Sequence, residues 1–243
     1  MNQIASIGEN LERVKERIHR SIHLAGREGD QVKLIVVTKG HPMEIVEAAI
    51  EAGVEDLGEN YVEESMPKIG MYPSSDSLRW HMIGHIQSRK AKAVSQKFDW
   101  VHTIDSIKLA RRLSRFAGEF GRQIPFLLEC NTSGEDTKFG WTAWNELEWK
   151  ELAEEISPLL EMENIIPRGL MTMAPFFDQP ESARLYFRRL RKLRDYFSEK
   201  FPQHEWGELS MGMSGDYEIA IQEEATIVRI GTAILGKRQI RED

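Results

Sequence analysis

The chain has 243 residues, a length at which one α/β barrel commonly folds around a single core. Its net charge of -7 argues against a general nucleic-acid binder, because such a protein needs a basic surface to neutralise phosphates. Cys130 is the only cysteine, which excludes an intramolecular disulfide and fits a reducing compartment. No apolar run approaches the roughly 18 residues of a membrane span, and the N-terminus lacks the apolar block of a signal peptide. We therefore expect a cytoplasmic protein without a membrane anchor.

An amphipathic helix is predicted at the N-terminus. Apolar residues recur there at steps of three and four, and Glu and Arg fill the other face. The stripe consists of Ile4, Ile7, Leu11, Val14, Ile18 and Ile22. Gly26 and Gly29 then end the helix. We expect it to pack against its own domain rather than on a membrane or a partner.

Strands and helices alternate in the rest of the chain. The eight predicted strands are Lys33–Thr38, Glu55–Leu57, Arg79–Ile83, Trp100–Ile104, Ile124–Cys130, Ile165–Met171, Glu208–Met211 and Thr226–Ile230. The predicted helices are Pro42–Gly53, one after Asn60, Gln87–Gln96, one from Asp105, Trp144–Ile156, Glu181–Phe201, Asp216–Gln222 and a short closing helix after Gly231. Eight such units without a linker favour one α/β domain over residues 1–243, a (β/α)8 or TIM barrel with an extra N-terminal helix. A doubly wound sheet is the alternative.

Lys39 is the first candidate functional residue. It follows Leu34–Val37, an apolar run typical of a strand buried on both faces. Active sites of α/β folds lie at the carboxyl ends of such strands. Partial burial there lowers the pKa of an ammonium group and leaves a free amine able to attack a carbonyl carbon. The alternative is a strand-end lysine that extends into solvent.

Two loops near the C-terminus predict a phosphate site. Gly231 and Thr232 follow the last strand, and Ser210 to Gly215 follow the strand before it. Glycine lets backbone N–H groups approach an anion, hydroxyl groups add donors, and barrels often bind phosphate after strands seven and eight. Arg229 lies inside the last strand, where its alternative role is an ion pair with Glu129 or Glu208. An amine, an arginine and a phosphate loop on one rim suggest pyridoxal 5'-phosphate.

Several motifs strengthen this interpretation. They are VVTKGHP, GENYVEE, WHMIGHIQSRK, HTID, NTSGEDTKFG, RGLMTMAP, LSMGMSGDYEIAI and VRIGTAILG, in this order from Val36 to Gly236. With them the chain resembles the pyridoxal phosphate homeostasis protein family, which consists of single-domain relatives of the N-terminal barrel of alanine racemases. The family more often reads SKTKP where this chain has Thr38–Pro42.

The resemblance implies a role for each matching residue. Lys39 would form the Schiff base with pyridoxal 5'-phosphate, and Arg229 would face the pyridine nitrogen. The phosphate would be held by Ser214, Gly231 and Thr232, and the pocket would be lined by Asn60, His81 and Ser210. No metal ligand set is expected, because His81 and His85 flank a predicted strand end and do not share a helix face.

The expected function is that of a cofactor carrier without catalytic turnover. An arginine keeps the pyridine nitrogen unprotonated, which weakens the ring as an electron sink. Racemases of this barrel type take a second acid or base from an additional domain, whereas this chain ends at Asp243, soon after the last strand. Local substitutes would be Tyr61, Tyr217 or His81. We expect a monomer that binds pyridoxal phosphate and serves apo-enzymes. The alternatives are an amino-acid racemase, another pyridoxal phosphate enzyme, and an aldolase that uses Lys39 without cofactor.

A basic amphipathic segment, RLYFRRLRKLRDYF, is the last pattern of note. It could contact an anionic surface. Its apolar positions form one stripe, however, consisting of Leu185, Leu190, Leu193 and Phe197. We therefore predict an ordinary barrel helix with a solvated basic outer face.

Overall fold

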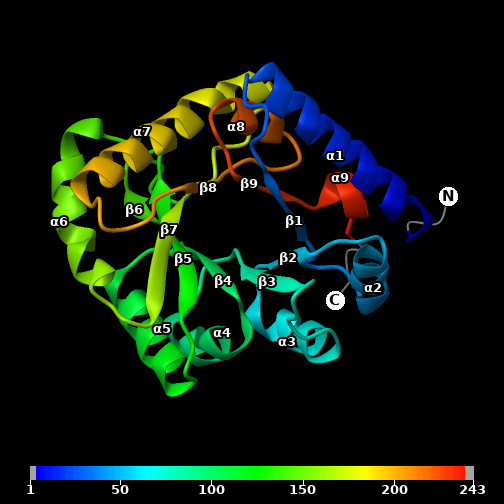
Figure 1. Cartoon of the computed structure of the whole chain (residues 1–243), viewed down its shortest axis with the longest axis horizontal. Coiled ribbons are helices and arrows are strands. Elements are labelled where there is room, and N and C mark those ends of the chain that lie inside the picture. Colours follow the sequence, from blue (N-terminus) through cyan, green and yellow to red (C-terminus); the bar gives the residue numbers. More distant parts are fainter. Residues whose placement is uncertain (1–3, 239–243) are drawn as a thin grey trace.

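The computed structural model describes residues 4–238 and forms a closed barrel of parallel strands surrounded by helices (Figure 1). The barrel strands are β1 (Lys33–Val37), β2 (Asp56–Glu59), β3 (Arg79–Met82), β4 (Trp100–Ile104), β5 (Ile124–Asn131), β7 (Ile165–Met171), β8 (Glu208–Ser210) and β9 (Ile227–Ile230). Pairing of β1 with β9 and of β4 with β5 closes the ring. The predicted (β/α)8 barrel is confirmed, and an open doubly wound sheet is excluded.

The helices follow the predicted alternation. They are α1 (Ile7–Leu24), α2 (Met43–Glu51), α3 (Val62–Met71), α4 (Ala91–Lys97), α5 (Ile107–Glu119), α6 (Trp149–Leu160), α7 (Arg184–Lys200), α8 (Tyr217–Gln222) and α9 (Thr232–Leu235). The sixth begins later than predicted, because Asn145 caps a separate 3-10 turn by accepting a hydrogen bond from the Leu147 amide. It also ends later, since Leu159 and Leu160 are buried and extend its apolar face.

One strand was not predicted. β6 (Trp141–Thr142) pairs beside the end of β5, with Cys130 opposite Trp141. The preceding Gly140 has a φ of +108°, and a Cβ there would lie 2.7 Å from the Glu129 carbonyl oxygen. A run of two residues is too short to show a strand pattern, so the sequence indicates only a loop.

The N-terminal helix packs on the outside of the barrel. α1 lies beside α8 and α9, so the first and the last helices of the described residues are neighbours (Figure 1). Asn10 donates a hydrogen bond to the Ile234 carbonyl oxygen, and Arg17 pairs with Glu218 at 2.9 Å. The predicted stripe is buried from Ile7 onward, whereas Ile4 is 42% exposed in the 3-10 turn that precedes the helix.

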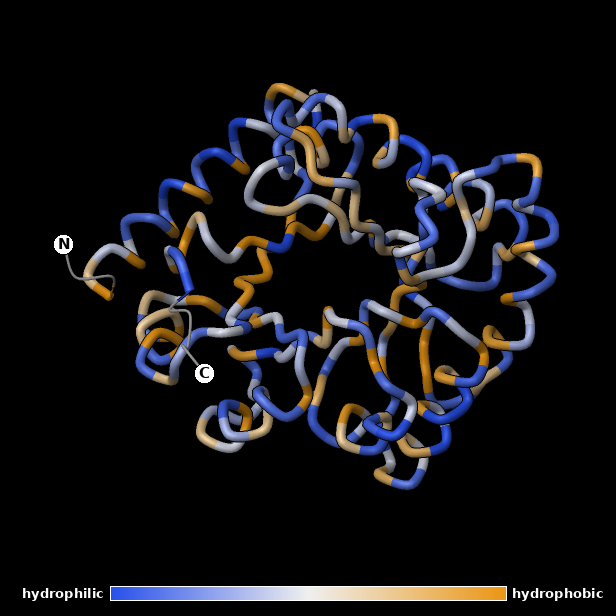
Figure 2. The backbone as a smooth tube through the Cα atoms, turned by 180° about the vertical axis from the view of Figure 1, so that it is seen from behind, coloured by the Kyte–Doolittle hydropathy of each residue, from blue (hydrophilic) through white to orange (hydrophobic). Residues whose placement is uncertain are grey.

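The core lies mainly between the strands and the helices. Figure 2 shows hydrophobic segments along the strands around the ring and mixed polarity along the outer helices. A second, small cluster consists of Ile35, Leu127, Met171 and Ile227. In the part of the chain that the structure describes, no helix is both long and apolar enough to cross a membrane.

The basic helix is a barrel helix, as predicted, but two details differ. Its buried residues are Phe187, Leu190, Leu193 and Phe197, while Leu185 is 58% exposed. The expectation for Leu185 was therefore wrong, and Phe187 takes its place on the inner face.

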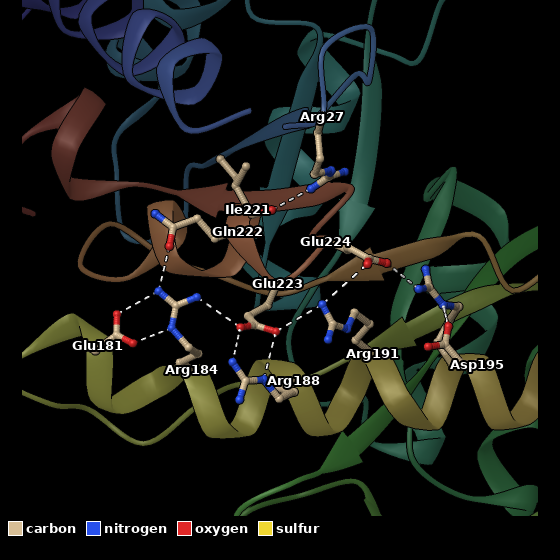
Figure 3. Close-up of polar contacts among 11 residues, drawn as sticks. Arg27, Glu181, Arg184, Arg188, Arg191, Asp195, Ile221, Gln222, Glu223 and Glu224 are labelled. Carbon is tan, nitrogen blue, oxygen red and sulfur yellow. Dashed lines mark hydrogen bonds and ion pairs between the residues drawn. The ribbon is translucent and has the colours of Figure 1, made fainter. Parts of the chain in front are cut away.

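Four arginines of α7 form ion pairs with Glu223 and Glu224 (Figure 3). The carboxylate of Glu223 is buried, and it contacts Arg184, Arg188 and Arg191 at 3.1, 3.0 and 3.3 Å. Arg194 binds the next residue, Glu224, at 2.6 Å. The arginines thereby fasten α7 to the turn between α8 and β9. The predicted solvated basic face did not include these ion pairs.

Candidate functional site

Lys39 lies in a turn directly after β1, at the carboxyl end of the barrel. The turn spans Thr38 to His41 and is closed by a hydrogen bond from the His41 amide to the Thr38 carbonyl oxygen. Gly40 has a φ of +71°, a conformation that side chains disfavour. The Lys39 amine makes no hydrogen bond or ion pair with any of residues 4–238. Burial, followed by the charges of Arg238 and Arg229, lowers the pKa of Lys39.

A second lysine anchors this turn from below. Lys68 of α3 is 4% exposed and donates to the Thr38 carbonyl oxygen at 2.9 Å and to Glu59 and Glu64 at 2.7 Å each. Glu64 also accepts the Gly40 amide at 2.6 Å. These contacts hold the backbone on both sides of Lys39, so its side chain leaves the turn in a defined direction.

A pocket of about 280 Å3 opens beside Lys39. Six of the eight residues predicted for the site line it: Lys39, Asn60, Ser214, Arg229, Gly231 and Thr232. They follow or end four different strands, β1, β2, β8 and β9, and the barrel brings them together. The loop after β7 completes the wall with apolar residues, including Met173, Pro175 and Phe177. The volume is near the lower end of the roughly 300–1,000 Å3 typical of small-ligand sites.

The predicted phosphate end is built from two tight backbone segments. A Cβ at Gly231 would lie 3.1 Å from the Val37 carbonyl oxygen, so glycine lets this loop approach β1. Gly212, with a φ of +93°, packs against α8, where a Cβ would meet that of Ala220 at 2.7 Å. The Met213 amide donates to Asp216 at 2.6 Å, which shapes the loop that carries Ser214.

Arg229 extends from β9 into the pocket wall and is 4% exposed. It donates to Ser210 Oγ at 2.6 Å and to the Thr172 carbonyl oxygen at 2.9 Å. Burial lowers the pKa of Arg229 to about 10, so the guanidinium remains charged at neutral pH. Within the described residues it forms no ion pair with Glu129 or Glu208, the alternative partners considered from the sequence.

His81 and Ser210 do not line the pocket, contrary to the expectation. They belong to a buried hydrogen-bonded chain that runs from Arg229 across the barrel. Ser210 Oγ lies 2.9 Å from His102 Nδ1, and His102 Nε2 lies 3.0 Å from His81 Nδ1. His81 Nε2 then contacts Asp56 at 2.7 Å, and Arg79 holds that carboxylate at 2.8 and 2.9 Å. His81 and Ser210 are therefore linked to the pocket through hydrogen bonds that end at Arg229.

Arg229 and Asp56, at the two ends of this hydrogen-bonded series, fix the direction of its hydrogen bonds. Arg229 only donates, and the Asp56 carboxylate only accepts. The Ser210 hydroxyl therefore donates to His102, His102 Nε2–H donates to His81, and His81 Nε2–H donates to Asp56. Burial lowers the pKa of both histidines, that of His102 more strongly, so each carries a single proton. Although burial raises the pKa of Asp56, hydrogen bonds from Arg79 and His81 hold it well below its usual range.

Sequence comparisons identify relatives of this chain. The alanine racemase N-terminal domain family matches residues 5–239. A pyridoxal phosphate homeostasis protein of Vibrio alginolyticus is 40% identical over 238 residues, which cover 97% of this chain and 99% of that protein. The chain belongs to the pyridoxal phosphate homeostasis protein family. The resemblance seen in the motifs is thereby confirmed.

Solved structures agree with this family assignment. PipY of Synechococcus elongatus matches with a TM-score of 0.83 at 33% identity, over 95% of this chain and all of that one. A second PipY structure has pyridoxal phosphate bound and matches with a TM-score of 0.75 at 34% identity, over 90% of this chain and all of PipY. An alanine racemase of Clostridium difficile shares the fold alone, with a TM-score of 0.66 at 16% identity over 97% of this chain and 57% of that enzyme.

Sequence reasoning missed several residues at the site. Lys68 has the appearance of an ordinary helical lysine, and His102 that of a strand histidine in the HTID motif. Asp216 was assigned only to a helix start, yet it lines the pocket, and burial raises its pKa. The GEN motif that supplied Asn60 also contains Glu59, which Lys68 contacts. The charge of Glu59, directly before the predicted site residue Asn60, was thus the signal in the sequence that could have indicated a buried partner such as Lys68.

Proposed function

We propose that this chain binds pyridoxal 5'-phosphate through a Schiff base on Lys39 and contributes to the balance of this cofactor in the cell, without catalytic turnover. The observation that carries the proposal is the pairing of an unpartnered, half-buried amine with an arginine and two glycine-bearing loops around one pocket. The relatives, which are pyridoxal phosphate homeostasis proteins, and the PipY structure with the cofactor bound support the same ligand.

The residues of the pocket fit the cofactor's three functional groups. Its aldehyde reacts with primary amines, and Lys39 provides one whose pKa is lowered. Ser214, Gly231 and Thr232 supply hydroxyl and backbone donors for a phosphate. Arg229 supplies a cation for the ring nitrogen, and two of its donors, which bind Ser210 and Thr172, fix its position.

The position of Arg229 supports a carrier rather than a catalyst. A guanidinium that remains charged leaves the pyridine nitrogen unprotonated and the ring a weak electron sink. The local candidates for a second acid or base are badly placed. Tyr217 is 1% exposed and lies against Arg17 of α1, while His81 is held in the buried chain. Tyr61 is 60% exposed and lines a neighbouring compartment.

We further infer that the chain acts as one domain and as a cytoplasmic monomer that supplies apo-enzymes. Pairing of β1 with β9 places both ends of the described chain in one barrel, which supports a single folding unit. The net charge of -7 supports neither nucleic acid nor an anionic membrane as a partner.

Covalent capture tests the proposal. The purified protein is incubated with pyridoxal phosphate, reduced with borohydride and digested for mass spectrometry. We expect a visible absorbance band and one modified peptide, which contains Lys39; Lys39→Ala should lose both. Lys108→Ala, at an exposed lysine of α5, is the matched control. A protein that remains colourless and unmodified would exclude the cofactor and favour the aldolase.

Solvent exchange tests the absence of turnover. The loaded protein is incubated with L-amino acids in deuterated water, and exchange of the α-proton is followed by NMR. We expect a rate no higher than that of free pyridoxal phosphate. Faster exchange, or formation of the D-amino acid, would establish the racemase alternative.

A further inference from the structure

A second compartment adjoins the pocket of Lys39. It has a volume of about 450 Å3 and lies over the ends of β2, β3 and β5. Asn60, Ile83 and Met173 line both compartments, so the two share a wall. On its outer side Phe139 stacks on His85, with 3.9 Å between ring centroids and 15° between ring planes. Nothing in the proposed holding of the cofactor uses this space.

Two buried oxygen atoms in this compartment lack hydrogen-bond donors. One is Glu129 Oε2, on a side chain that is 3% exposed, and the other is Asn60 Oδ1. Both atoms are acceptors. Among the described residues that line the compartment, no buried side-chain donor lacks a partner. A ligand that satisfies the site must therefore donate hydrogen bonds.

The charges around Glu129 favour a cation. From the end of β4, Asp105 faces it and is paired with His85 of the loop after β3 at 3.0 Å. The charge of Arg229, on β9, lowers the pKa of Glu129, but the guanidinium donates its hydrogen bonds to Ser210 and Thr172 instead. Burial, followed by Asp105, raises the pKa of Glu129 to about 7, against the effect of Arg229. The carboxylate thus lies buried, and no cation of residues 4–238 pairs with it.

We propose that the second compartment binds a primary ammonium group, with Glu129 as its counter-ion and Asn60 as a second acceptor. An ammonium carries three N–H donors and a positive charge, which is what the two unpartnered oxygens lack. This proposal deepens the proposed function and rests on it for its role. Release would be an exchange of amines: the ammonium passes one proton to Glu129, its nitrogen forms the new C=N bond to the aldehyde carbon and passes a second proton to Lys39 Nζ, and the bond to Lys39 breaks, which leaves Lys39 as a free amine. The compartment is thus where a releasing amine enters.

Two sources of the ammonium share this chemistry. One is a free amino acid, and the other is a lysine side chain of a polypeptide. Arg89 lines the exposed part of the same compartment, and its Nε donates to Gln87 at 2.9 Å. A free amino acid would bring a carboxylate for this arginine, whereas a lysine side chain would bring only an alkyl chain and the ammonium.

Binding to the protein without cofactor tests the proposal directly. The probe is n-butylamine, with n-butanol as its uncharged counterpart, and binding is followed by ligand-detected NMR. We expect n-butylamine to bind the wild type and Glu129→Gln to weaken this binding at least about tenfold. We expect n-butanol to bind the wild type no better than it binds the variant. Glu161→Gln, at an exposed carboxylate after α6, is the matched control. Equal binding by the wild type and Glu129→Gln would overturn the proposal.

The pH dependence gives a second readout that needs no variant. Because only the ionised carboxylate attracts the ammonium, affinity should fall about tenfold between pH 8 and pH 6 as Glu129 takes up its proton. This measurement keeps the proposal testable if Glu129→Gln fails to fold. An affinity that stays constant over this range would contradict it.

L-Alanine and Nα-acetyl-L-lysine amide distinguish the two sources. Tighter binding of the first, weakened by Arg89→Gln, supports a free amino acid, and tighter binding of the second supports a polypeptide lysine. Binding of neither would overturn the proposal. Cofactor capture by the wild type separates this site from the proposed function. Amine binding without cofactor uptake by the wild type refutes the function alone, and cofactor uptake without amine binding by the wild type refutes the second site alone.

Discussion

Arg229 donates a hydrogen bond to Ser210 Oγ over 2.6 Å, and this contact joins the pocket to the buried histidine pair. Ser210→Ala would leave an N–H of Arg229 and Nδ1 of His102 without a partner. A buried polar group without a partner costs about 1–3 kcal/mol, so we expect the free energy of unfolding to fall by that amount. Urea denaturation measures it.

A structural cost alone would not change the site, so affinity for pyridoxal phosphate supplies a second readout. We expect Ser210→Ala to bind the cofactor more weakly, because the Arg229 side chain loses one of the two hydrogen bonds that hold it in place. Ser198→Ala is the control, since that exposed serine only bonds the Arg194 carbonyl oxygen of its own helix. Cofactor affinity equal to that of the wild type would show that the hydrogen bonds from Ser210 to Asp56 do not position Arg229.

Lys68→Met should disturb the turn that carries Lys39. The substitution removes the charge that lies 2.7 Å from both Glu59 and Glu64, and it leaves the Thr38 carbonyl oxygen with the His41 amide alone of its two donors. Breaking a buried ion pair costs about 3–5 kcal/mol, and we expect a loss of this size in urea denaturation. Covalent capture at Lys39 should slow as well. Lys15→Met breaks an exposed pair with Glu12 and should change stability by less than about 0.5 kcal/mol. Similar losses in the two variants would contradict the anchoring role of Lys68.

The barrel and most of the pocket were predictable because their signals are local. Apolar runs mark β1 and β9, and Lys39 and Gly231 come within two residues of their ends. In a parallel barrel such residues lie at the same end, whatever the register of the strands. Position in the chain was therefore enough to assign these residues to a common site.

The rest depended on register and side-chain direction, which one sequence does not contain. His81 and His102 are in strands, but whether they line the pocket or lie beneath it follows from the pairing of β3 with β4. The inner face of α7 was misjudged for a similar reason. Leu185 and Phe187 both fit near the start of an apolar stripe, and only packing against the sheet selects Phe187.

Glu223→Gln should loosen α7 from the turn between α8 and β9. Burial raises the pKa of Glu223, but hydrogen bonds from Arg188 and Arg184 outweigh it, and the pKa is lowered. A lowered carboxyl pKa contributes stability above the unfolded value, which is lost as the pH falls through the folded value. We expect the variant to lose about 1–3 kcal/mol at pH 7 and less at acidic pH, measured by urea denaturation.

The control for this surface is an exposed ion pair between α7 and the 3-10 turn before α6. Glu146 contacts Lys192 at 3.1 Å, and both side chains are about half exposed, at 47% and 52%. Glu146→Gln should therefore change the free energy of unfolding by less than about 0.5 kcal/mol. If Glu223→Gln behaves like Glu146→Gln, the arginines of α7 do not fasten the helix.

Glu129→Gln should change how stability depends on pH. Burial, followed by Asp105, raises the pKa of Glu129 from 4.5 to about 7, so the folded protein holds a proton that the unfolded chain has released. Its contribution to stability is complete below the unfolded value and is lost as the pH rises through about 7. Relative to the wild type, Glu129→Gln should gain about 2–3 kcal/mol between pH 5 and pH 8 in urea denaturation. Glu161→Gln, which is exposed, should follow the wild type throughout. Parallel stability curves for the wild type and Glu129→Gln would mean that Glu129 ionises at its ordinary pH, and the buried acceptor assigned to the second compartment would then lie in water.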